Sequence, residues 1–300
     1  MKLVILLSTY NGEKYLKKQL DSLFAQSTNN FQIIVRDDGS TDGTLKILKS
    51  YNIILLSAKE NIGTKQSFST LLAYALENTK STYFMFCDQD DIWEENKIEK
   101  TLKEIQELEL RYKNIPLLVH TNLKVLDQSL NVKHDSFWKY EYIDPFTNSC
   151  SRLLLQNTVT GCTAIINRKL VELALPIPNN AIMHDWWLGL VASKFGKISH
   201  LKESTVCYRQ HTNNTVGARG FGIYYIINNI TKKDLLLKHI QQAKVFLDIY
   251  RDTLDKDTIQ ILEDFSTIES KSFWQKRKIL LKHKLLKQGF IRNMGLLFKI

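Results

Sequence analysis

The chain has 300 residues, of which 44% are hydrophobic and 24% charged, and this composition excludes a disordered chain and suits one large globular domain or a domain with an appendage. The formal net charge is +10, and no window holds the roughly 18 uninterrupted apolar residues that a membrane-spanning helix requires. The four cysteines are widely spaced, which argues against a zinc site or a disulfide framework, and we expect free thiols in a reducing cytoplasm. The first apolar stretch is too short for a signal peptide and predicts a strand.

Short apolar runs alternate with longer segments of helical spacing over the first 120 residues. Strands are predicted at 3–8, 31–36, 53–57, 83–87 and 116–120, and helices at 12–26, 41–51, 64–78 and 96–112. Strands that are apolar throughout are typical of a parallel sheet covered by helices on both faces. The sequence therefore predicts an α/β domain, followed by mixed signals up to residue 215, a helix at 184–195, and a basic helical region after residue 220.

Polar residues follow three of these strands. They are Ser8 to Asn11, Arg36 to Ser40, and Asp88 to Asp91. Ligands of such sheets bind at the carboxyl ends of the strands, so we expect all three clusters on one rim.

Asp88, Asp90 and Asp91 crowd three carboxylates after one strand. Like charges at this spacing repel unless a cation, a hydrogen-bond donor or water compensates them. Oxygen ligands suit Mg²⁺ or Mn²⁺, whereas the alternative is N-capping of the following helix. The residues alone leave both interpretations open.

Three further sites carry similar alternatives. The stretch RDDGSTDGT at 36–44 suits a turn and a helix cap, although its excess of acceptors indicates that Asp38 reads a ligand N–H such as a pyrimidine imide. Asp185, at the start of HDWWLGL, suits a helix N-cap or a general base. His211 suits a surface histidine or a metal ligand brought to the acidic cluster by the fold.

Taken together, several stretches resemble the inverting glycosyltransferases of family 2, which have the GT-A fold, a Rossmann-like, mostly parallel sheet flanked by helices. They are STYNG, VRDDGSTDGT, ENIGTKQSF, CDQDD, TGCTAIINR and HDWW, in this order along the chain. The set DQDDIW, HDWWLGL and YRQHTNNTVGAR looks most like bacterial rhamnosyltransferases of cell-wall and capsular polysaccharide synthesis. This resemblance implies dTDP-L-rhamnose as the donor, with a UDP-sugar as the alternative.

The resemblance also implies roles for individual residues. The nucleotide sugar is expected at Thr9, Tyr10, Asn11, Asp38, Asn61, Gly63, Lys65 and Asp88, and Mn²⁺ or Mg²⁺ at Asp90, Asp91 and His211. Asp185 is the expected base, and the acceptor is expected at Gly161, Cys162, His184, Trp186 and Trp187, with core packing an equal alternative for the two tryptophans. Two other functions stay open: a nucleotidyltransferase, whose Gly-rich, Lys-bearing signature is missing, and a non-catalytic partner in glycan assembly.

The tail from residue 271 has no Asp or Glu and nine basic residues, Lys271, Lys276, Arg277, Lys278, Lys282, Lys284, Lys287, Arg292 and Lys299. Large apolar residues between these cations favour a helix on an anionic membrane over an ordinary packed helix, and nucleic acid is not expected because no binding motif accompanies the charge. We therefore expect a transferase domain at 1–217 and a membrane-associating helical region at 218–300, working on a lipid-linked glycan acceptor at the inner face of the cell membrane. A homodimer interface is an alternative use of the aromatic tail.

Overall fold

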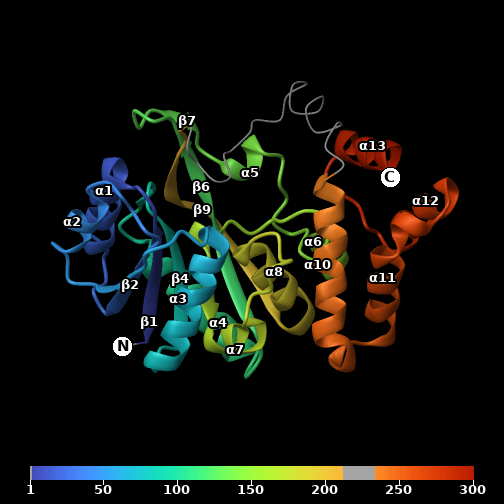
Figure 1. Cartoon of the computed structure of the whole chain (residues 1–300), viewed down its shortest axis with the longest axis horizontal. Helices are drawn as coiled ribbons and strands as arrows, with labels where there is room; N and C mark the ends of the chain where they lie inside the picture. The colour runs from blue at the N-terminus through green and yellow to red at the C-terminus, as the bar shows by residue number, and fades with distance from the viewer. Residues whose placement is uncertain (1, 212–233) are drawn as a thin grey trace.

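A computed structural model of the protein describes residues 2–211 and 234–300. Its elements, in chain order (Figure 1), are β1 (Leu3–Thr9), α1 (Glu13–Phe24), β2 (Phe31–Asp37), α2 (Thr44–Leu48), β3 (Ile54–Ser57), α3 (Thr64–Asn78), β4 (Tyr83–Asp88), β5 (Ile92–Trp93), α4 (Lys97–Arg111), β6 (Leu117–Leu126), β7 (Val132–His134), α5 (Phe137–Tyr140), α6 (Cys150–Leu153), β8 (Ile165–Asn167), α7 (Arg168–Ala174), α8 (His184–Phe195), β9 (Lys197–Arg209), α10 (Asp234–Tyr250), α11 (Lys256–Ser266), α12 (Phe273–Lys282) and α13 (Phe290–Lys299). All five predicted strands and the predicted helices are confirmed, with shifts of a few residues at their ends.

The strands form one mixed sheet in the order β3-β2-β1-β4-β8-β6-β9-β5, with β7 paired to β6. The four strands from β3 to β4 are parallel, as predicted. The expectation of a mostly parallel sheet needs one correction, because the short strand β8 lies antiparallel between β4 and β6 and so separates two strands that run the same way. The carboxyl ends of β1, β2, β4 and β6 still share one rim, because two antiparallel pairings in succession restore the direction.

The sheet buries both of its faces. Alternate residues of β1 show this, since Leu6 belongs to one hydrophobic cluster and Ile5 and Leu7 belong to the other. Helices α3, α7 and α8 cover the first face, and α1 and α4 cover the second. Helix α4 has the amphipathic pattern that such a covering helix requires. Its buried Ile98, Thr101, Ile105 and Leu108 recur at helical spacing on one side.

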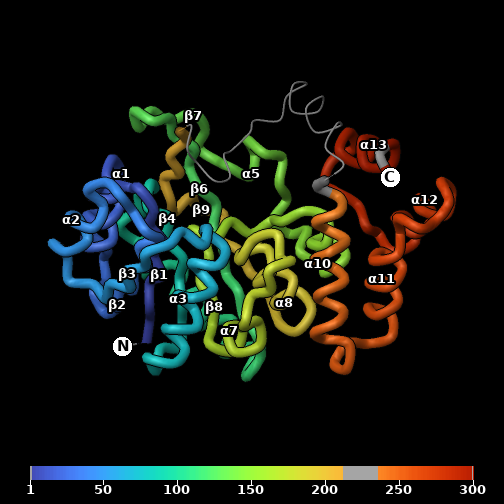
Figure 2. Tube along the Cα trace, in the orientation of Figure 1, coloured from blue at the N-terminus to red at the C-terminus, as the bar shows by residue number. Residues whose placement is uncertain are grey.

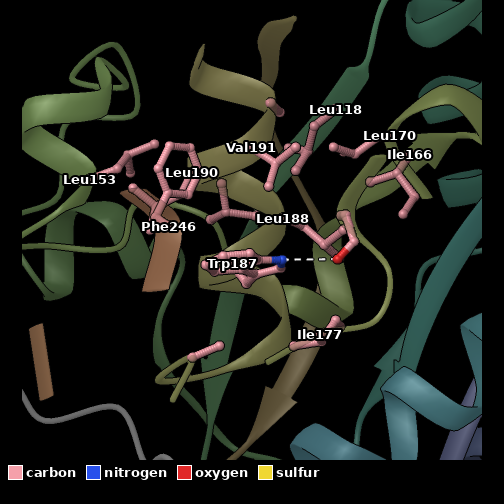
Figure 3. Close-up of a cluster of buried hydrophobic side chains, with 14 of the residues drawn as sticks. Leu118, Leu153, Ile166, Leu170, Ile177, Trp187, Leu188, Leu190, Val191 and Phe246 are labelled. Carbon is pink, nitrogen blue, oxygen red and sulfur yellow. Dashed lines mark hydrogen bonds between the residues drawn. The ribbon is translucent and has the colours of Figure 1, made fainter. Parts of the chain in front are cut away.

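Of the C-terminal helices, α10 packs beside α8, and α11 lies on the far side of α10 (Figure 2). Trp187 of α8 lies between residues of both parts of the chain, with its ring 5.6 Å from that of Phe246 and 6.0 Å from that of Tyr250. Figure 3 shows Trp187 and Phe246 among the leucines of this core. The expected boundary at residues 217 and 218 falls outside the described residues. Among the helices of the described ranges, none is long and apolar enough to cross a bilayer.

Candidate active site

The rim formed by the ends of β1, β2 and β4 gathers the predicted polar residues. Ser8 pairs with Asp88 of β4, and Thr9 pairs with Asp37 of β2, in the registers of the parallel strands. Helix α8 brings Asp185 to the same place. Asp185 and Asp88 are close enough for their charges to interact. Residues nearly 100 positions apart in the sequence therefore meet at one end of the sheet.

The loop after β1 is fastened to the loop after β2. The Thr9 hydroxyl donates to Oδ1 of Asp37 over 3.1 Å, and the Ser40 hydroxyl donates to the same oxygen over 2.6 Å. The Asn11 backbone N–H donates to the Ser40 hydroxyl, and Oδ1 of Asn11 accepts from the Thr41 N–H, both over 2.9 Å. Asp37 is fully buried. The sequence does not distinguish it from the adjacent Asp38, because both are aspartates in RDDGS.

Asp38 is only 2% exposed, and its carboxylate binds the chain itself. It accepts the backbone N–H groups of Ile62 and Gly63 at 2.9–3.1 Å and pairs with the Arg36 guanidinium. These three donors leave about one of the four acceptor positions of a carboxylate for a ligand. Asp38 therefore shapes the loop 61–63 in addition to any contact with a nucleotide.

The other residues expected at the nucleotide sugar also lie near this loop. Gly63 has a φ of +80°, a conformation that favours glycine, and its N–H donates to Oδ1 of Asn61 over 2.8 Å. Nζ of Lys65 donates to the backbone carbonyls of Asn179 and Ala181, at 2.5 and 2.8 Å. Burial lowers the pKa of Lys65, with a smaller effect from the charge of Lys238. Lys65 thus joins the start of α3 to the segment before α8.

Gln89, in the middle of the acidic cluster, holds the first loop in place. Its side-chain oxygen accepts the Tyr10 N–H over 2.9 Å, and its side-chain nitrogen donates to the Tyr10 carbonyl over 3.1 Å. The Tyr10 ring remains 44% exposed beside the rim. A planar side chain at position 89 therefore fixes the backbone of residue 10 and leaves its ring free to stack on a ligand.

The three carboxylates of the acidic cluster have different environments. Oδ2 of Asp90 lies 2.7 Å from Nε2 of His211, whose ring stacks on Tyr15 at 4.6 Å. Asp91 is fully buried, and one of its oxygens accepts the Arg209 N–H over 3.2 Å. Burial first, and the charge of Asp90 second, raise the pKa of Asp88 to about 7 and that of Asp91 well above its ordinary range. Asp88 and Asp91 therefore hold a proton more readily than an ordinary aspartate, and a bound cation would favour their ionised forms.

Two sets of donor atoms fit a divalent cation. Asp88, Asp91 and Cys162 offer ligand atoms within 4.8 Å of one another, and Asp90 with His211 offers an oxygen and an imidazole nitrogen already in contact. Burial and the neighbouring carboxylates raise the pKa of Cys162 well above its usual range, so the group is a neutral thiol and a poor ligand. Oxygen donors with one imidazole suit Mn²⁺ or Mg²⁺ better than a soft metal.

Asp185 lies in the first turn of α8 and is held at both oxygens. The Gly161 N–H and the Asn157 amide donate to Oδ2 over 3.1 and 3.2 Å, and the Trp186 N–H donates to Oδ1 over 2.7 Å. Burial raises the pKa of Asp185 to about 6, although these hydrogen bonds oppose the rise. A carboxylate with this pKa accepts a proton readily and is ionised at neutral pH, as a general base requires. Asn157 carries no sequence signal that could have identified it.

Of the residues expected at the acceptor, Gly161, His184 and Trp186 lie around the start of α8, near Asp185. A Cβ on Gly161 would lie 2.9 Å from Nε2 of His184, so only glycine allows this close approach to α8. His184 is 4% exposed between Phe68 and Phe86, and burial lowers its pKa to about 3, which keeps the ring neutral. Trp186 is half-buried and donates its indole N–H to the Leu153 carbonyl.

Trp187 packs in the hydrophobic core, the alternative that the sequence left open. Its side chain is 0% exposed, and its indole N–H donates to the Ala174 carbonyl over 3.0 Å, the dashed line of Figure 3. A side chain without solvent contact cannot form the wall of an acceptor site, so we do not retain this role for Trp187. The physical cause is its place on α8, one position further round the helix than Trp186 and facing α10.

A buried cation lies beneath the acidic cluster. Lys97, at the start of α4, is fully buried, and its Nζ lies 4.5 Å from the centre of the Trp93 ring without a hydrogen-bond partner among the described residues. Burial lowers its pKa to about 8, and Cys162, Cys87 and Asp91, in this order, oppose the effect. The sequence did not reveal this cation, because a lysine at the start of an amphipathic helix is usually solvated.

Comparison with known proteins gives consistent results. The sequence profile described as "Glycosyl transferase family 2" matches residues 4–172, more than half of the chain. The dTDP-rhamnosyl transferase RfbG of Shigella flexneri is 29% identical over 71% of this chain and 74% of its own length. An uncharacterized glycosyltransferase of Rickettsia typhi is 32% identical over 54% of this chain, which spans about half (49%) of that relative.

Solved structures agree on the fold. S. aureus TarS 1-349 in complex with UDP-GlcNAc has a TM-score of 0.53 at 16% identity, over 99% of this chain and 90% of that protein. The mannosyltransferase PcManGT of Pyrobaculum calidifontis, in complex with GDP-Man and Mn²⁺, has a TM-score of 0.51 at 15% identity, over 99% and 78% of the two chains. At these identities the likeness concerns the GT-A fold alone. Because the family profile matches more than half of its length, the chain belongs to glycosyl transferase family 2 and is a nucleotide-sugar glycosyltransferase.

Proposed function

We propose that the chain transfers a sugar from a nucleotide-diphosphate sugar to an acceptor hydroxyl with inversion at the anomeric carbon, and that it uses Mn²⁺ or Mg²⁺. The observation that carries this proposal is the position of Asp185, a hydrogen-bonded carboxylate with a pKa of about 6, beside the acidic cluster at one rim of the sheet. A base on the side opposite the leaving nucleotide supports in-line attack.

The side chains divide the work between them. Asp185 accepts the proton of the acceptor hydroxyl, at a carboxylate oxygen that the Gly161 and Asn157 donors keep in place. Asp90 and His211 would hold the cation, with Asp88 next to it. The cation supplies Lewis-acid chemistry, because it neutralises the charge that develops on the diphosphate. Tyr10 and Asn11 would contact the nucleotide from the loop that Gln89 and Ser40 fix.

We propose dTDP-L-rhamnose as the donor. Its support is the match over 71% of the chain to a relative that is named a dTDP-rhamnosyl transferase, together with the stretches DQDDIW and HDWWLGL. We further propose a lipid-linked or growing glycan of a bacterial cell wall or capsule as the acceptor, met at the inner face of the membrane. The basic, apolar tail supports this placement of the enzyme.

Thermal-shift and transfer assays on the purified chain test the proposal. Ligands that bind the folded state raise its melting temperature, so dTDP-rhamnose with Mn²⁺ should stabilise the chain more than UDP- or GDP-sugars do, and EDTA should abolish the difference. A response to UDP-sugars alone would keep the transferase and exclude rhamnose. Nucleotide binding without any transfer would favour a non-catalytic partner in glycan assembly.

Two substitutions separate the roles of the carboxylates. Asp185→Asn should lower kcat by roughly 10²–10⁴-fold while donor binding persists, because only the proton acceptor is lost. Asp90→Asn should instead weaken the metal-dependent stabilisation by the donor. The exposed Asp248 of α10 provides a matched control, since Asp248→Asn removes the same charge far from the rim. Full activity of wild-type chain in EDTA would contradict the metal requirement.

A further inference from the structure

Helices α12 and α13 expose an unusual amount of apolar side chain. The described part of the chain has 18 exposed large apolar residues, and seven of them lie between positions 273 and 298. They are Phe273, Trp274, Leu281, Phe290, Ile291, Met294 and Phe298. Trp274, Phe290 and Phe298 are each 78% exposed, although such side chains usually lose most of their solvent contact on folding. We call these seven residues and the cations beside them the tail surface.

The exposed residues follow helical spacing. On α12, Trp274 and Leu281 are two turns apart on one stripe, and Arg277, Lys278 and Lys282 occupy the same stripe. Together with Leu297 of α13, these side chains line a wide, open apolar depression of about 580 Å³. The Arg277 guanidinium donates to the Leu297 carbonyl and so holds α12 against α13.

Helix α13 presents a second apolar stripe. Phe290, Met294 and Phe298 recur every four residues on its exposed side, whereas Leu296 on the other side is buried in the core. An amphipathic helix normally buries its apolar stripe, so this arrangement indicates a partner for the exposed side.

The charge of the segment selects the kind of partner. Residues 271–300 contain nine Lys or Arg and no acidic residue. A second copy of the same surface would bring like charges together, which disfavours a dimer through this face. The exposed apolar side chains and the positive charge together require a partner with negative charge next to an apolar interior. An anionic bilayer is such a partner, because aromatic residues enter the acyl boundary while Lys and Arg reach the headgroups.

We propose that the tail surface docks the enzyme onto an anionic lipid bilayer. This docking rests on the proposed function, because a lipid-linked acceptor lies at such a surface. The tail also contacts the segment that leads to the base: Arg152 donates to the Leu286 carbonyl, and the Gln288 N–H donates to the Gln156 side chain. The next residue after Gln156 is Asn157, which donates to Asp185. Docking would therefore place the bilayer near the acceptor side of the active site.

Vesicle flotation of the full chain tests the docking without any turnover. We expect binding to phosphatidylcholine vesicles that contain about 30% phosphatidylglycerol, little binding to phosphatidylcholine alone, and release by high salt. Each cation near such a surface strengthens binding roughly fivefold, so the double variant Lys278→Glu, Lys282→Glu should bind at least about 25-fold more weakly. The double variant Trp274→Ser, Phe298→Ser should also lose binding, since it removes the inserted rings.

Matched controls lie on α4. Leu110 is 75% exposed and Lys103 is exposed, so Leu110→Ser and Lys103→Glu make the same changes elsewhere and should leave vesicle binding unchanged. Equal losses in the control and tail variants would overturn the proposal, and so would equal binding to neutral vesicles. A change of oligomeric state in the tryptophan variant, with no vesicle binding by wild-type chain, would assign the face to a second copy instead.

The same variants keep this proposal separate from the proposed function. Transfer to a water-soluble acceptor analogue should be unchanged in the tail variants, because none of their residues lies at the rim. Asp185→Asn should lose transfer and still bind vesicles. Vesicle binding without transfer in wild-type chain would refute the proposed activity alone, and transfer without vesicle binding would refute the docking alone.

Discussion

The substitution Asp185→Asn should make the protein more stable at alkaline pH while it removes the base. The folded state raises the pKa of Asp185 from an ordinary 3.8 to about 6, chiefly by burial. A carboxyl with a raised pKa binds more protons in the native state than in the unfolded state over this interval, so stability falls as the pH rises from about 4 to about 6. Above pH 6 the full cost of the buried charge is present in wild-type chain and absent from the variant.

The size of the effect follows from the shift. Two pKa units correspond to at most about 3 kcal/mol of unfolding free energy. The carboxylate is half-buried, and an asparagine can accept from the Gly161 N–H but not also from the Trp186 N–H, so we expect a net gain of about 1–2 kcal/mol above pH 7. The gain should disappear near pH 4, where both forms are uncharged.

Urea denaturation in EDTA, at several values between pH 4 and pH 8, measures this difference directly. Asp248→Asn serves again as the control and should show no such pH dependence. A variant that is less stable than wild-type chain at pH 8, or a difference that does not change between pH 4 and pH 7, would refute the assignment of a raised pKa to Asp185. Transfer by wild-type chain should fall below about pH 6 for the same reason, because a protonated base cannot accept the acceptor proton.

Four further substitutions test the packing and the buried lysine. Gly196→Ala should destabilise the protein by about 3 kcal/mol or more, because its Cβ would lie 1.8 Å from the Pro116 carbonyl oxygen. A Cβ on Gly295 of α13 meets nothing within 4 Å, so Gly295→Ala should be neutral or stabilising by up to about 1 kcal/mol. Thermal denaturation of the two variants measures both effects. Trp187→Ala should cost about 3–5 kcal/mol in urea denaturation, and a cost below about 1 kcal/mol would contradict its place in the core. Burial lowers the pKa of Lys97 from 10.5 to about 8, so the stability of wild-type chain should rise between pH 8 and pH 10 as the native state loses this proton first, and Lys97→Met should abolish that rise.

Local patterns in the sequence determined most of the fold and the identity of the chemical groups. The runs LVILLS, FQIIVR and YFMFC are apolar at every position, so they could only be strands buried on both faces, and their polar continuations had to meet on one rim. Asp88, Asp90 and Asp91 were identified in this way, whereas Asp185 was identified from the stretch HDWWLGL that opens a predicted helix and from the family resemblance. The antiparallel strand β8 escaped prediction because its three residues are too few to show a period.

The contacts of each of these side chains follow from the packing of distant segments. Trp186 and Trp187 are adjacent and identical in the sequence, yet one lies half-buried near the rim and the other is sealed against α10. Asp90 contacts His211, 121 positions away, while the neighbouring Asp91 is turned inward to the Arg209 backbone. The physical reason is that burial and hydrogen-bond partners depend on segments brought together by packing, whereas strand and helix patterns depend on neighbours along the chain.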